Sequence, residues 1–333
     1  MSAALAYPPR LAEATAPPER RGVARDAVRL LVSDRANGTH EHRRFFDLPS
    51  ILRAGDLLVV NDSATLPAAL DARRQNGETL RLHVSTAIDA RISLVEPRGA
   101  VLSGEELRLP DGGSVVMLAP VEPEMPRVWY GWFQLPLPMT AYLLQAGEPI
   151  RYAYVKERFP LEDYQTIFAR EPGSSEMPSA ARPFSTRTLR DLRLRGVEIA
   201  AVTLHCGVAS FEAPERPTIE RYAVSSAAVA AIRRAREKGR RVIAVGTTVV
   251  RALESAVRGG EIIASSGWTD LVIDGSKPAS TVDGLLTGFH GETATHQWML
   301  RAFATTSLLS QAYAEAASRG YYQHEFGDVH LIV

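Results

Sequence analysis

The pattern of apolar and polar positions divides the chain into segments of two kinds. Short apolar runs at 57–61 and 241–245 are typical of strands that are covered on both faces. Residues 65–154 instead carry short apolar runs separated by turn signals such as Pro110–Gly113, which predicts an antiparallel barrel or sandwich. From about Asp163 onward, helical periods alternate with buried strands, so we expect a layered α/β domain with a mainly parallel sheet.

The same pattern predicts the positions of the individual elements. A β-rich domain inserted into an α/β domain is the simplest architecture that accommodates them. Further strands are predicted at 27–34, 39–45, 197–205, 270–273 and 330–333. Helices are predicted at 47–55, 186–196, 226–238 and 249–257, and 288–318 is expected to be largely helical.

Composition narrows the class of protein. The chain has 333 residues, 45% of them hydrophobic, which is enough for two domains with apolar cores. Its 38 basic and 38 acidic residues cancel, so a nucleic-acid site would have to be a local patch, such as the arginines at 187–195 or 233–241. Both clusters are equally compatible with solvated helix faces. The single cysteine, Cys206, excludes an internal disulfide, and no membrane span or secretory signal is apparent, so we expect a cytoplasmic protein.

A strand, a tight turn and a helix start follow one another at 241–257. Gly246 ends the strand, and Thr247 or Thr248 is expected to cap the helix. Backbone N–H groups at such a turn favour a carboxylate or phosphate, and Arg251 lies one turn further on, where it could complete an anion clamp. The turn lacks the lysine of a Walker A loop and the glycine spacing of a dinucleotide fingerprint. A capped helix in an ordinary α/β layer remains the alternative.

Other polar residues fall at predicted strand ends, where α/β sheets place their sites. They are Asn61, His205, Asp283, His290 and Asp328. A histidine in such a place is often a structural residue, so a catalytic role requires that the sheet bring His205 and His290 together. His290, Glu292 and His296 do not have the spacing of a zinc-binding helix, and no metal is expected. No nucleophile elbow is present either.

At these residues the chain resembles a known family, the S-adenosylmethionine:tRNA ribosyltransferase-isomerases of queuosine biosynthesis. The matching segments occur in family order over nearly the whole chain. They are Glu41–Leu48, Leu52–Asp62, Tyr164–Ala169, Val202–His205, Val242–Ser255, Val282–His290 and Phe326–Asp328. The resemblance implies an α/β domain formed by residues 1–62 and 155–333 and an inserted antiparallel β-barrel domain formed by residues 63–154.

The resemblance also implies a reaction. Family members transfer and isomerise the ribosyl part of S-adenosylmethionine onto 7-aminomethyl-7-deazaguanine in the tRNA anticodon, which gives epoxyqueuosine and releases adenine and methionine. This reaction needs a base, a proton donor and an anchor for the methionine carboxylate. The residues that we expect to serve it fall into two groups. Those for catalysis are His205, His290 and Asp283; those for substrate binding are Asn61, Arg182, Gly246, Thr247, Thr248, Arg251 and Asp328.

The resemblance further implies a transferase whose partners are S-adenosylmethionine, as substrate rather than cofactor, and the tRNA anticodon stem-loop. A monomer or weak dimer is expected. The chain departs from the family pattern in several site segments, at Ala69, Met177–Phe184, His205–Phe211, Asp274–Ser276 and Gly288–Thr295. Pro183 stands where the family has a histidine, and Arg182 where it has a leucine. Two alternatives therefore remain: a divergent paralogue with another acceptor, and a non-catalytic RNA- or ligand-binding module.

Overall fold

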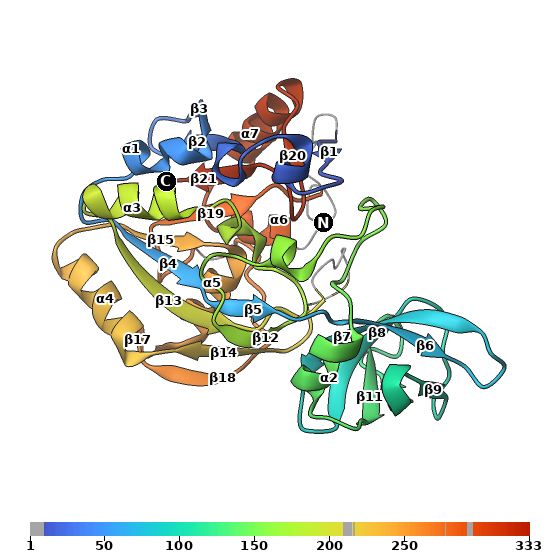
Figure 1. The fold of residues 1–333 in the computed structure, drawn as a ribbon. Coiled ribbons are helices and arrows are strands. Elements are labelled where there is room, and N and C mark those ends of the chain that lie inside the picture. The colour runs from blue at the N-terminus through green and yellow to red at the C-terminus, as the bar shows by residue number, and fades with distance from the viewer. Residues whose placement is uncertain (1–9, 209–214, 216, 277, 292–295) are drawn as a thin grey trace.

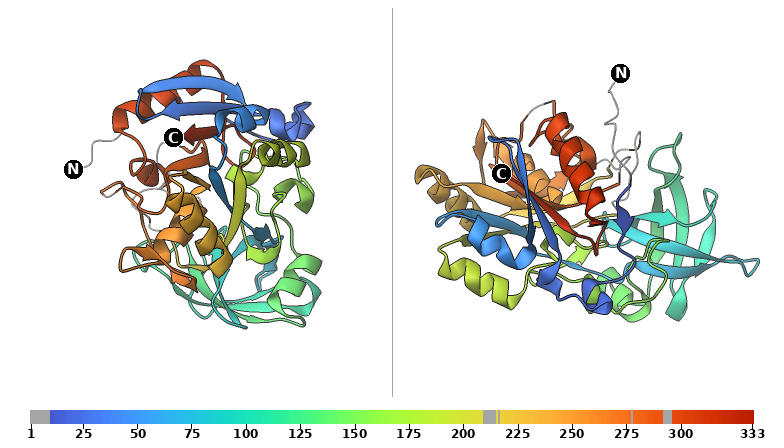
Figure 2. Two further views of the ribbon diagram at one scale, coloured as in Figure 1. Left: turned by 90° about the vertical axis from the view of Figure 1, so that its left-hand side faces the viewer. Right: turned by 90° about the horizontal axis from the view of Figure 1, so that it is seen from above.

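The structure, a computed structural model, describes residues 10–208, 215, 217–276, 278–291 and 296–333. These residues form an α/β body and a β-barrel that projects from one end of it (Figures 1 and 2). The predicted α/β fold with an inserted antiparallel barrel is thereby confirmed. The domain boundaries predicted above stay a prediction.

A nine-stranded sheet runs through the described part of the α/β body, in the order β18-β14-β13-β4-β15-β19-β21-β2-β3. Its central strands β13, β4, β15 and β19 are parallel, while β21 is antiparallel to β19 and parallel to β2. The bounds are β2 Arg29–Asp34, β3 Thr39–Arg44, β4 Leu57–Asn61, β13 Glu198–Leu204, β14 Glu220–Val224, β15 Val242–Val245, β18 Ser265–Thr269, β19 Gly284–Gly288 and β21 Val329–Ile332.

Helices cover both faces of this sheet because its central strands are apolar on both sides. In β4, Leu57 and Val59 face one core, and Leu58 and Val60 face the other. The first core also takes the apolar sides of α4, α5 and α7, and the second takes those of α1 and α3. The bounds are α1 Leu48–Ile51, α3 Thr186–Leu194, α4 Ser226–Glu237, α5 Thr247–Ser255, α6 His296–Leu300 and α7 Thr306–Ser318.

The barrel closes in the order β10-β11-β8-β7-β6-β9, with its own apolar core. Its strands are β6 Ala69–Arg73, β7 Thr79–Ala87, β8 Ile92–Pro97, β9 Glu106–Arg108, β10 Ser114–Pro120 and β11 Trp129–Gln134, and α2 Met139–Ala146 follows them. Three small strand pairs complete the described strands: β1 Ala12–Glu13 with β20 Tyr322–Gln323, β5 Ser63–Thr65 with β12 Glu171–Ser174, and β16 Val257–Arg258 with β17 Glu261–Ile262.

Three local predictions were wrong. Residues 270–273 form no strand: β18 ends at Thr269, and the next strand of the parallel sheet is β19. The helix expected at 47–55 is short and ends at Ile51. Gly246, rather than Thr247 or Thr248, is the N-cap of α5. The misplaced strand matters for the site. Asp283 was expected to follow a strand, but it precedes β19 and therefore lies at the other edge of the sheet.

Candidate functional site

A cavity of about 240 Å³ opens at the carboxyl edge of the parallel strands. Residues that follow β13, β15 and β19, such as Cys206, Gly246 and His290, form one part of its wall. The chain segment that returns from the barrel, with Tyr152 and Tyr154, forms another part. In a parallel sheet all carboxyl ends meet at one edge, so this is where the fold is expected to place a site.

The N-terminus of α5 faces this cavity, as the strand–turn–helix pattern predicts. Gly246 has φ 97° and ψ 151°, a conformation open mainly to glycine, and its N–H donates to the Leu286 carbonyl at 2.8 Å. Thr247 and Thr248 form the first turn of the helix and line the cavity. Because amides in a first turn have no partner within their helix, this end of α5 offers donors and a favourable dipole to an anion.

Arg251 lines the same cavity, and its guanidinium is engaged with the protein. Its guanidinium forms a buried ion pair with Glu220 and also donates to the carbonyls of Leu271 at 3.0 Å and Thr269 at 3.4 Å. Both charged side chains are about nine-tenths buried. Arg251 therefore fastens α5 to β14 and to the end of β18, and its predicted role as an anion ligand stays a prediction.

Asn61 is likewise committed to the protein. Its amide nitrogen donates to the Leu204 carbonyl at 2.8 Å and to the Thr248 hydroxyl at 3.2 Å, and its amide oxygen accepts from the N–H groups of Ser63 and Leu204. The side chain is fully buried and does not line the cavity. Its contribution is to position Thr248 rather than to bind substrate directly.

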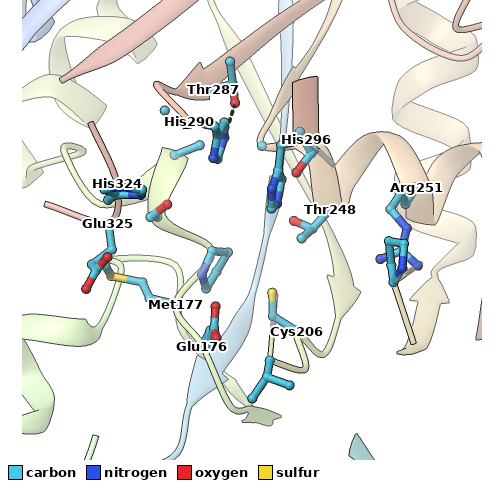
Figure 3. A pocket seen from close by; sticks show the side chains of 18 of the residues that line it. Glu176, Met177, Cys206, Thr248, Arg251, Thr287, His290, His296, His324 and Glu325 are labelled. Atoms are coloured by element: carbon cyan, nitrogen blue, oxygen red, sulfur yellow. Dashed lines mark hydrogen bonds between the residues drawn. The ribbon is translucent and has the colours of Figure 1, made fainter. Parts of the chain in front are cut away.

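Two histidines stack at the cavity wall (Figure 3). The rings of His290 and His296 are parallel, with centroids 4.2 Å apart. Burial, reinforced by the other positive groups, lowers the pKa of His290 well below its ordinary value and that of His296 to about 4. Both imidazoles are therefore neutral at pH 7 and can accept a proton.

His205 is not brought together with His290. Its ring packs against Gly173, its Nδ1 lies 2.7 Å from the Ser63 hydroxyl, and it does not line the cavity. Burial lowers its pKa. The structure thus separates the two histidines that the sequence proposed as one acid–base set, and His296 takes the place beside His290.

Two acidic candidates, Asp283 and Asp328, also lie outside the cavity. Asp283 precedes β19, at the amino edge of the sheet, where its carboxylate accepts the Val242 N–H at 2.8 Å. Asp328 accepts the N–H groups of Arg29 at 2.7 Å and Tyr322 at 2.8 Å. Their expected roles at the site are corrected accordingly, because both carboxylates hold backbone in place.

Arg182 is turned toward the N-terminal segment. It donates to the Asp163 carbonyl at 2.9 Å and to the Glu19 carboxylate at 3.0 Å, and it does not line the cavity. Its side chain is 3% exposed, so a substrate could reach it only after this segment moved. The predicted substrate contact of Arg182 is therefore not supported.

Sequence reasoning missed the wall that faces α5. There Tyr152 donates to Glu176, and Tyr154 donates to Glu325. The rings of Tyr152 and Tyr154 stack with centroids 5.9 Å apart, and His324 stacks on Tyr154 at 4.6 Å. The sequence carried one signal for this wall, the polar segment 325–328 before the last strand, but no local pattern pairs it with tyrosines about 170 positions earlier.

Some predictions fall on residues that the structure does not describe. Glu292 and residues 209–211 and 292–295 of the altered motifs lie outside it. Within the described ranges, no group of three or more histidine, cysteine, aspartate or glutamate side chains could hold a metal ion. In the same part of the chain, no helix combines the length and apolarity that crossing a membrane requires.

Comparison with known proteins adds three findings. Residues 6–332 match the protein family described as "Queuosine biosynthesis protein". Proteins named S-adenosylmethionine:tRNA ribosyltransferase-isomerase are similar over most of their length: the one from Moorella thermoacetica is 39% identical, covering 93% of this chain and 94% of that relative, and the one from Acidithiobacillus ferrooxidans is 37% identical, covering 92% of each. The crystal structure of S-adenosylmethionine tRNA ribosyltransferase from Thermotoga maritima matches with a TM-score of 0.56 and 30% identity, covering 98% of both chains.

Proposed function

The chain belongs to the queuosine biosynthesis protein family, and we propose that it is an S-adenosylmethionine:tRNA ribosyltransferase-isomerase. It transfers and isomerises the ribosyl group of S-adenosylmethionine onto 7-aminomethyl-7-deazaguanine in the tRNA anticodon and forms epoxyqueuosine. The observation that carries this proposal is the match to the family over residues 6–332, together with a cavity at the carboxyl edge of the sheet.

The donor binds with its methionine carboxylate at the N-terminus of α5. The amides of Thr247 and Thr248 supply hydrogen bonds, and the helix dipole favours the negative charge. Asn61 holds the Thr248 hydroxyl. Arg251 contributes through its ion pair with Glu220, which keeps α5 in place, and not through contact with the carboxylate.

The stacked histidines accept a proton from the donor and later return it. Neutral His290 or His296 removes an acidic proton from the carbon beside the sulfonium, because a buried imidazole with a lowered pKa is a free base at pH 7. The imidazolium that results is a strong acid in the same surroundings, so it returns the proton to the departing adenine. One pair of side chains thus serves as base and then as acid.

A second candidate function is the same transfer to a different acceptor. It is favoured by the altered segment 177–184, in which Pro183 replaces a histidine of the family and Arg182 is engaged with Glu19.

Adenine release tests both candidates. We expect the protein to release adenine from S-adenosylmethionine with tRNA that carries 7-aminomethyl-7-deazaguanine, and not with the same tRNA carrying guanine. His290→Gln should lower this rate by about 10²- to 10⁴-fold, whereas His205→Gln, at a histidine outside the cavity, should affect it far less. A rate no greater with the modified tRNA than with the guanine tRNA would contradict the first candidate and leave the second.

A further inference from the structure

Segment 271–273 is an apolar run that forms no strand and lines the cavity. Leu271, Val272 and Ile273 are all partly buried, and all three are cavity residues. Ile273 also packs against the core that takes α4, α5 and α7, whereas Leu271 and Val272 belong to none of the apolar cores of the described residues. Ligand cavities are lined mainly by apolar side chains that a bound ligand covers. Leu271 and Val272 therefore offer the cavity an apolar surface that the described protein leaves partly uncovered.

Both backbone polar groups of Leu271 are fixed from α5. Its carbonyl accepts a hydrogen bond from Arg251 Nε at 3.0 Å. Its N–H donates to Thr269 Oγ1 at 3.2 Å, and the same oxygen accepts from the Ser255 hydroxyl at 2.6 Å. Arg251 and Ser255 both belong to α5. The position of Leu271 relative to this helix is therefore set before a ligand binds, which lowers the cost of ordering on binding.

The helix α5 also holds the chain that leads from this segment to β19. The Glu254 carboxylate accepts the N–H and the hydroxyl of Ser280 at 2.6 and 2.9 Å. It accepts those of Thr281 at 2.8 and 2.9 Å. Hydrogen bonds to an ionised carboxylate are stronger than those between neutral groups. The helix whose N-terminus faces the cavity thus fixes the chain on either side of segment 271–273.

Leu271 lies about one helical turn from the proposed carboxylate site. Arg251 follows Thr247 by four residues, so it lies on the same face of α5, about 6 Å further along the axis. Thr247, Arg251 and Leu271 all line the cavity. In S-adenosylmethionine, the methylenes of the methionyl chain come directly after the carbon that carries the carboxylate, whereas adenine lies beyond the sulfonium and the ribose. The methylenes are thus the apolar part of the donor within reach of Leu271.

We propose that Leu271 and Val272 cover the methylenes of the donor's methionyl chain, and that Thr269 is a positioning residue that orients Leu271. Thr269 is 4% exposed and does not line the cavity, so it acts through the Leu271 backbone and not by touching the donor. This inference rests on the proposed function, because it assigns a part of the proposed donor to segment 271–273.

Calorimetry with three ligands tests the assignment. S-adenosylmethionine and S-adenosylhomocysteine both contain the methylenes of the methionyl chain, and 5′-methylthioadenosine keeps the adenosine part but lacks that chain. We expect Leu271→Ala to weaken the binding of the first two ligands about three- to tenfold, because less apolar surface is buried on binding. The affinity for 5′-methylthioadenosine should stay within about twofold of wild type.

Leu118→Ala is the matched control for the leucine. It removes the same atoms from a side chain on β10 that is 39% exposed and does not line the cavity, so it should bind all three ligands as wild type does. For the positioning residue, Thr269→Val deletes the hydroxyl and should weaken the two chain-bearing ligands about threefold or more. Thr269→Ser keeps the hydroxyl and should restore wild-type affinity.

Three outcomes would overturn parts of this proposal. Unchanged binding of S-adenosylmethionine by Leu271→Ala would remove the segment from the donor site. An equal loss for 5′-methylthioadenosine would show that Leu271 contacts the adenosine part instead. An equal loss in Thr269→Ser and Thr269→Val would show that the hydroxyl does not orient Leu271. Each of these is measured against a wild-type protein that binds S-adenosylmethionine, whereas a wild-type protein that did not bind it would contradict the proposed function and this inference together.

Discussion

The two walls of the cavity differ in how far the protein itself satisfies their polar groups. On the α5 wall, Arg251 is paired with Glu220, and the Thr248 hydroxyl is held by Asn61. On the tyrosine wall, which comprises Tyr152, Tyr154, Tyr164, Glu176 and Glu325, one buried hydroxyl has no partner among the described residues. A polar residue that lines a cavity is thus not necessarily a ligand: what distinguishes a ligand is acceptor or donor capacity that the fold leaves unused.

Removing Arg251 should have the largest effect on stability. Arg251→Ala leaves Glu220 as a buried, unpaired charge, and we expect the free energy of unfolding to fall by about 3–5 kcal/mol. Denaturant unfolding measures this change. The control is Arg190→Ala, because Arg190 pairs with Asp191 at the surface, and its loss should cost less than about 1 kcal/mol. Equal losses in both variants would show that the α5 wall does not depend on the buried pair.

The histidine beside this wall should make stability depend on pH. His296 has a folded pKa of about 4 against an ordinary value of 6.5, so the unfolded chain binds a proton first as pH falls. We expect unfolding free energy to decrease between pH 6.5 and 4, and His296→Gln to remove about 1–3 kcal/mol of this decrease. Glu325 and Asp328, whose pKa values are raised by burial, act in the opposite sense, so the difference between variant and wild type is the quantity to measure. If the curves of unfolding free energy against pH ran parallel for the variant and the wild type, the lowered pKa of His296 would be contradicted.

A single methyl group added at the turn before α5 should lower the stability of the protein. In Gly246→Ala the new Cβ meets only ordinary contacts, with Thr248 Oγ1 at 3.5 Å and Ala180 Cβ at 3.6 Å. The positive φ alone should therefore lower stability by about 1–2 kcal/mol. We also expect weaker binding of S-adenosylmethionine by calorimetry. Gly288→Ala is the matched control, because Gly288 also lines the cavity but has no positive φ and open space at its Cβ.

The smallest stability effect is expected at the tyrosine wall. Tyr164→Phe removes a hydroxyl that makes no hydrogen bond with the described protein, so unfolding free energy should change by less than about 0.5 kcal/mol. Thermal and denaturant unfolding both measure this. A loss above that value would mean that the hydroxyl has a structural partner, and the contrast between the two walls would then disappear.

Local patterns were sufficient for the fold but not for the site. The apolar runs of β4 and β15 and the break at Gly246 were readable because a buried strand and a tight turn each have a local signature. The site depended on tertiary pairing: nothing near Arg251 in the sequence identifies Glu220 as its partner, and nothing near Glu325 identifies Tyr154. Placing a strand at 270–273 instead of 284–288 was sufficient to assign Asp283 to the wrong edge of the sheet.

The structure of the protein with S-adenosylmethionine bound would test the central claim most directly. We predict that the methionine carboxylate lies within hydrogen-bonding distance of the Thr247 and Thr248 amides and that Arg251 remains paired with Glu220. A carboxylate bound to Arg251 with Glu220 displaced would contradict this account of the α5 wall.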